Sequence, residues 1–133
     1  MRIRPLAEQG MTFQQAVKIW IGLVFPPEIV NNKQERNHRF LEEALELVQA
    51  AGGTAEAAHK LVDYVFSRPV GEIPDEIGGT MITLAALCNV HNLDMDEAAL
   101  DCLDRAGLKI NNIREKQKLK PKLYDDKVEF ERG

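Results

Sequence analysis

The sequence predicts an all-α protein, with a core of four helices and a fifth, basic helix towards the C-terminus. Apolar residues recur three and four positions apart along nearly the whole chain of 133 residues, which is the periodicity of amphipathic helices. No segment alternates apolar and polar residues as a half-buried strand does. Capping residues precede the periodic segments, and glycine or proline follows them, so the expected helices have marked ends.

Local signals bound the first two helices. The first begins at Thr12, whose spacing to Gln15 is that of a capping box. It ends before Pro26–Pro27, because proline disfavours a helical conformation in the residue before it. An asparagine of the Asn31–Asn32 pair can cap the second helix. That helix continues to Gly52–Gly53, a strong stop signal.

The third and fourth helices have similar signals. Thr54 can cap the third helix, which closes at Arg68–Pro69. Pro74 suits the first turn of the fourth helix, where its missing N–H group costs nothing. The fourth helix should end near Asn92. Its adjacent glycines, Gly78–Gly79, each cost ~1 kcal/mol relative to alanine, which suggests that a packed helix or a bound ligand approaches the backbone there.

The fifth helix should begin at Asp94, because Glu97 follows three residues later as in a capped start. It is expected to run towards Ile113 and to kink at Gly107. From Pro121 the chain is polar, so residues 121–133 are expected to form a flexible tail.

Length and composition favour one domain, residues 1–133, of a cytoplasmic protein. Apolar residues make up 44% of the chain, enough for a core, and 29% are charged. The net charge of −4 gives no reason to expect a nucleic-acid partner. We expect no membrane partner, because no apolar stretch is long enough to span a bilayer and the N-terminus lacks the apolar part of a signal peptide. Cys88 and Cys102 lie in helical patterns, as reduced core thiols do.

Three glutamates lie within the apolar run Phe40–Val48 of the second helix. Glu43 and Glu46 share a helix face, and Glu42 lies one turn before Glu46. Like charges at this spacing repel, and the cost rises where carboxylates lose water among apolar side chains. A hard divalent cation, Mg²⁺ or Mn²⁺, would offset that cost. The alternative is an ordinary solvated face, since glutamate is a strong helix former.

A second acidic cluster opens the fourth helix, within Glu72–Gly79. Glu76 faces the same direction as Gly79. The pair Glu43-x-x-Glu46, followed about 30 residues later by this acidic helix start, resembles the MazG-like all-α nucleoside triphosphate pyrophosphohydrolases. The resemblance covers roughly residues 12–117.

The resemblance implies a MazG-like four-helix core, assembly as a homodimer or homotetramer, and four carboxylates that hold Mg²⁺ or Mn²⁺. Glu43, Glu46 and Glu76 would be three of these ligands, and Glu42 would orient or deprotonate the attacking water. The family's fourth ligand is an aspartate where this chain has Gly79. Asp75 or Glu72 is the candidate replacement; loss of one metal site is the alternative.

The resemblance also implies groups that bind phosphates. Lys109 and Asn112 match a lysine and an asparagine that the family often carries on its last helix. Arg39 shares a helix face with Glu43 and is a further candidate, although its spacing equally allows an ion pair with Glu35 or Glu43.

Several segments resemble a narrower branch of the family, called MazZ, found in phages that replace adenine with 2-aminoadenine. These segments are Phe25–Val30, Glu35–Glu43, Leu61–Phe66, Arg68–Pro69 and Glu76–Gly79. The branch converts dGTP or GTP to the monophosphate, so the resemblance implies this substrate and, for a phage protein, the host cytoplasm. Cleavage of dUTP, dCTP or dATP and a non-catalytic helical nucleotide-binding protein are the alternatives.

Overall fold

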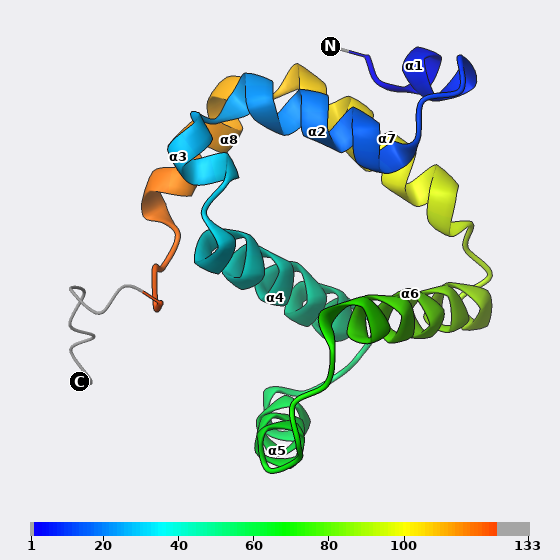
Figure 1. The fold of residues 1–133 in the computed structure, drawn as a ribbon. Coiled ribbons are helices and arrows are strands. Elements are labelled where there is room, and N and C mark those ends of the chain that lie inside the picture. The colour runs from blue at the N-terminus through cyan, green and yellow to red at the C-terminus, as the bar shows by residue number, and fades with distance from the viewer. Residues whose placement is uncertain (1, 125–133) are drawn as a thin grey trace.

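The protein is described by a computed structural model that covers residues 2–124, and these residues are helical with no strand (Figure 1). The all-α prediction is confirmed for this part of the chain. The helices are α1 (Arg4–Glu8), α2 (Phe13–Val24), α3 (Pro27–Val30), α4 (Lys33–Ala50), α5 (Ala55–Phe66), α6 (Ile73–Val90), α7 (Met95–Leu108) and α8 (Ile110–Leu119). Among them, none is both long and apolar enough to cross a bilayer.

Four predicted helix caps are confirmed. The side chain of Thr12 accepts from the Gln15 amide, and Gln15 Oε1 accepts from the Thr12 amide, which completes the capping box. Of the two asparagines, Asn32 is the cap of α4, since its side chain accepts from the Glu35 amide at 3.0 Å. Thr54 and Asp94 cap α5 and α7 in the same way, by accepting from the Ala57 and Glu97 amides.

Two features differ from the sequence prediction. The expected fifth helix is divided, because α7 ends at Leu108 and α8 begins at Ile110. The break falls at Lys109, two residues after the expected kink at Gly107. Lys109 between them has a φ of −122°, outside the helical range. Short helices α1 and α3 also form where no helix was predicted, and each carries a proline in its first turn.

The first and last helices form a small packed unit. Ile3, Ala16 and Leu103 are its buried apolar centre and bring α1, α2 and α7 together. Asp104 of α7 accepts hydrogen bonds from the amides of Ile3 and Arg4, which fixes the start of α1. From α8, Arg114 donates to the carbonyls of Leu23 and Val24 and so satisfies the free end of α2.

Helices α4 and α6 lie apart from this unit, α5 projects outwards between them, and α6 leads back to α7 (Figure 1). No residue of α5 or α6 is buried, and α4 buries only Glu35. Within the described residues these three helices therefore do not close into a four-helix core. The large apolar side chains that they leave exposed are Phe40, Leu41, Leu45, Leu47, Val48, Leu61, Val62, Val65, Phe66, Ile73, Ile77, Met81, Ile82 and Val90.

Candidate functional site

The acidic face of α4 carries two unpaired carboxylates. Glu43 and Glu46 are exposed, and neither has an ion pair or a side-chain hydrogen bond within residues 2–124. Both lie in the continuous helix Lys33–Ala50, so they share a face as predicted. These carboxylates are open to solvent and to any cation that approaches this face.

The start of α6 carries the second set of carboxylates. Glu72 occupies the cap position without a side-chain capping bond, and Asp75 and Glu76 lie in the first turn. Acidic side chains there are stabilised by the helix dipole, which is a structural role they have without any ligand. Glu76 folds back over the preceding loop, since a Cβ atom on Gly71 would collide with its carboxylate.

The glycine pair of α6 faces open space. A Cβ atom added to Gly78 or Gly79 would meet no other atom within 4 Å. The close approach that the sequence suggested is thus not made by another segment of the described chain.

The predicted metal ligands are not gathered within one chain. No group of three or more histidine, cysteine or acidic side chains within residues 2–124 is arranged to hold a metal ion. Glu43 and Glu46 lie on α4, whereas Glu76, Asp75 and Glu72 lie at the start of α6. A site that uses both sets therefore requires α4 to meet an α6, of the same chain or of a second copy.

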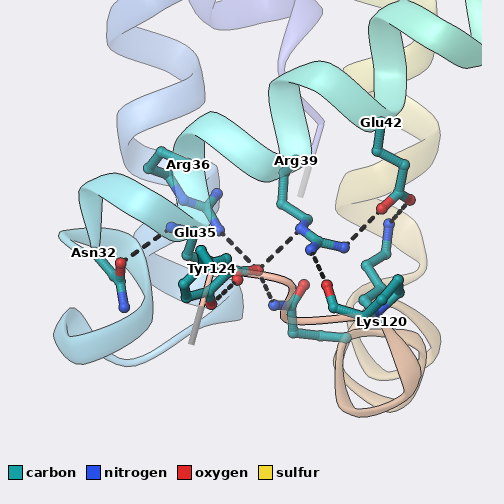
Figure 2. Close-up of polar contacts among 9 residues, drawn as sticks. Asn32, Glu35, Arg36, Arg39, Glu42, Lys120 and Tyr124 are labelled. Atoms are coloured by element: carbon teal, nitrogen blue, oxygen red, sulfur yellow. Dashed lines mark hydrogen bonds and ion pairs between the residues drawn. The ribbon is translucent and has the colours of Figure 1, made fainter. Parts of the chain in front are cut away.

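A buried carboxylate organises the first half of α4 (Figure 2). Glu35 is only 2% exposed and accepts hydrogen bonds from Gln117 Nε2 and Tyr124 Oη. Its carboxylate also lies 3.2 Å from Arg39 Nε and 3.8 Å from Arg36 Nη2. Burial would raise the pKa of Glu35, but the bonds from Tyr124 and Gln117 and the charges of Arg39 and Arg36 outweigh it and lower that pKa.

Glu42, the expected base, and Arg39, an expected phosphate ligand, form an ion pair with each other (Figure 2). Arg39 Nη1 donates to Glu42 Oε2 at 2.6 Å, and its Nη2 donates to the Pro121 carbonyl at 2.6 Å. Lys120 Nζ donates to the other oxygen, Glu42 Oε1, at 2.5 Å. Of the alternatives considered for Arg39, the ion pair with Glu35 is present, and the second partner is Glu42 rather than Glu43.

A groove of about 430 Å³ lies between α4 and α5. Glu42 and Glu46 line it, and Gln49 and His59 add polar groups that the sequence did not single out. Gly53 fixes the corner between the two helices, because a Cβ atom there would lie 2.9 Å from the Val48 carbonyl oxygen. The rest of its lining is Leu45, Val48, Thr54, Ala55, Ala58 and Val62.

The predicted phosphate ligands of the last helix lie together in a separate place. Lys109 is the residue between α7 and α8, and Asn112 lies in the first turn of α8. Both line a hollow of about 320 Å³, formed by residues 107–112 alone. None of the predicted carboxylate ligands contributes to this hollow.

Comparisons with models of protein families, with curated proteins and with solved structures each find no match for this chain. The MazG-like resemblance therefore rests on the residues quoted above.

Proposed function

We propose that the protein is a metal-dependent nucleotide pyrophosphohydrolase that converts dGTP or GTP to the monophosphate and pyrophosphate. In a phage of the kind described above, this product would supply 2-aminoadenine nucleotide synthesis in the host cytoplasm. The observation that carries the proposal is the pair of unpaired carboxylates, Glu43 and Glu46, on an exposed helix face with many apolar side chains.

Comparison with the other acidic side chains of α4 supports a metal-binding role for Glu43 and Glu46. Glu35 and Glu42 lie on the same helix, and both are paired with cationic side chains. Glu43 and Glu46 have no such partner among residues 2–124. Carboxylate oxygens suit Mg²⁺ and Mn²⁺. Glu43, Glu46 and Glu76 would hold the ion, with Asp75 or Glu72 in place of the family's aspartate.

A bound divalent ion supplies the positive charge that lets an acidic face accept a triphosphate. The protein's own residues then position and activate the nucleophile. Glu42 would take a proton from a water molecule as the water oxygen bonds to the α phosphorus. The bond from that phosphorus to the bridging oxygen breaks, and pyrophosphate leaves. Arg39 would hold phosphate oxygens beside the carboxylates. Lys109 and Asn112, which lie in a separate hollow, would hold them from a neighbouring subunit.

The exposed surface supports assembly as a homodimer or homotetramer. The chain exposes 10977 Å², whereas a compact monomer of 15.0 kDa exposes ~7,000 Å². Residue 1 and residues 125–133 would contribute at most ~1,600 Å² if counted as unfolded chain. The remaining excess, ~2,300 Å² per chain, is of the size that obligate interfaces bury. A second copy that covers α4, α5 and α6 would also bring acidic helix faces together.

The test is release of pyrophosphate from each canonical nucleoside triphosphate, with Mg²⁺ or Mn²⁺. Glu43→Gln and Glu46→Gln should abolish release, because each removes a ligand charge without changing the side-chain shape. Glu56→Gln is the matched control: Glu56 is exposed on α5 and pairs with Lys60 at 3.3 Å. Wild-type turnover in either ligand variant would reject the assignment. Light scattering measures the assembly.

The same assays separate two alternatives from this proposal. Another substrate, dUTP, dCTP or dATP, leaves the metal argument unchanged, and the nucleotide panel identifies it. A non-catalytic nucleotide-binding protein is favoured by Gly79, which stands where the family has its fourth ligand. Calorimetry with Mn²⁺ and nucleotide, set beside the turnover assay, distinguishes it: binding without turnover supports this second class.

A further inference from the structure

The segment that follows α8 is attached to α4 through one buried carboxylate. Helix α8 ends at Leu119, and Lys120 has extended backbone angles, as the residue before a proline prefers. Glu35 accepts from Gln117 before this point and from Tyr124 after it, one bond on each oxygen. The chain between these two contacts is therefore held against α4, in contrast to the flexible tail expected from residue 121 onwards. Residues 125–133 of that expected tail lie outside the described residues. We call residues 120–124 the strap.

The strap occupies two groups that the proposed reaction needs. Lys120 holds Glu42 Oε1, while Arg39 holds Glu42 Oε2, so both oxygens of that carboxylate are engaged by cations. The carbonyl of Pro121 accepts from Arg39 Nη2. In this arrangement each oxygen of Glu42 already accepts a hydrogen bond from a cationic group, so fewer of its lone pairs are left for water, and Arg39 is turned towards protein groups.

We propose that the strap is autoinhibitory, and that a polyphosphate anion opens it by competing for Arg39 and Lys120. The proposal rests on the roles given above to Glu42 and Arg39. Opening breaks the contacts of Lys120 and Pro121 and carries Tyr124 away from Glu35, while Gln117 remains in α8. Glu42 Oε1 then loses its cationic partner and is open to water, so substrate binding and activation of the base are coupled.

The charges around the strap explain why an anion would open it. Arg36, Arg39 and Lys120 are set against two carboxylates, Glu35 and Glu42, so the cluster has one excess positive charge. The ion pair of Lys120 with Glu42 is accessible to solvent, because both side chains are 28% exposed. A polyphosphate can reach such a pair and compete with Glu42 for Lys120, because it brings several negative charges where Glu42 brings one.

Tyrosine resonances can report the opening without any turnover. The chain has two tyrosines; Tyr124 bonds to Glu35 and lies edge-on to His38 at 4.8 Å, whereas Tyr64 is exposed on α5. Labelling the full chain with 3-fluorotyrosine gives one fluorine signal for each, assigned with Tyr64→Phe. Inorganic triphosphate in EDTA should move the Tyr124 signal towards that of a solvent-exposed tyrosine and leave Tyr64 unchanged. Sodium chloride at equal ionic strength should move neither.

Two lysine variants separate the strap from a general effect of charge. Lys120→Met should move the Tyr124 signal in the same direction without any anion and raise kcat several-fold. Lys118→Met is the matched control, since Lys118 pairs with Glu115 at 3.1 Å and is 69% exposed. The control should leave signal and kcat unchanged. An unmoved Tyr124 signal, with triphosphate or in Lys120→Met, overturns the strap, and so does a lower kcat in Lys120→Met.

Failure of the strap and failure of the proposed function are distinguishable. A moving Tyr124 signal in a protein that releases no pyrophosphate from any nucleotide supports the anion-opened strap and rejects the enzyme. Turnover with a Tyr124 signal that triphosphate leaves in place rejects the strap and supports the enzyme.

Discussion

Replacing Glu35 by glutamine should destabilise the protein more than any other single change of an acid to its amide. The substitution keeps the side-chain shape but leaves Arg39, 12% exposed, and Arg36, 32% exposed, without their shared counter-charge. Removing one partner of a buried ion pair costs about 3–5 kcal/mol. Because glutamine can still accept one hydrogen bond, Arg39 keeps its ion pair with Glu42 at 2.6 Å and Arg36 is partly hydrated, we expect the lower end of that range, ~3 kcal/mol.

The measurement is urea unfolding followed by circular dichroism at one fixed protein concentration, since assembly makes stability depend on concentration. Glu56→Gln removes an exposed ion pair at 3.3 Å and should cost less than ~1 kcal/mol. If Glu35→Gln also lost less than ~1 kcal/mol, the argument that this carboxylate holds α4, α8 and the strap together would be refuted.

Three further outcomes are expected. The pKa values of Glu35 and Asp104 lie below their ordinary range. Each carboxylate therefore stabilises the fold fully above about pH 5 and loses that effect progressively as pH falls through its folded pKa; acid unfolding of Asp104→Asn should be less steep than that of the wild type. Thr12→Ala removes the cap of α2 and should cost ~1 kcal/mol in urea unfolding; no loss would mean that the cap is replaced by water. Leu45→Glu places a charge on the exposed apolar face of α4 and should shift light scattering to monomer; an unchanged mass would exclude that face from the interface.

Helix ends were predictable because their signals are local. Thr12, Asn32 and Thr54 cap helices through amides three residues away, so a short stretch of sequence contains the whole interaction. The division between α7 and α8 was not predicted at its observed place, because Lys109 is not a residue type that breaks helices. The short helix α3 is not evident from the sequence, because Pro26–Pro27 ends the preceding helix while Pro27 also suits the first turn of a new one.

The polar network around Glu35 was largely beyond the sequence. Its bonds to Gln117 and Tyr124 join residues 82 and 89 positions apart, and helix periodicity carries no information about such pairs. The spacing of Glu35 and Arg39 did allow an ion pair, and that pair is present. Whether Glu46 meets Glu76 depends on how α4 and α6 pack, which no spacing within either helix determines.

The open glycines of α6 have a consequence for how the protein behaves on dilution. Gly78 and Gly79 lie in the middle of an 18-residue helix that buries no side chain within its own chain. An isolated helix of that length is marginal in water, and two glycines weaken it further. Its backbone amides should therefore exchange with solvent deuterium almost at the rate of an unstructured peptide when the chains are far apart. These amides should become protected only where subunits meet. Protection of α6 from exchange should therefore increase with protein concentration, as the assembly forms.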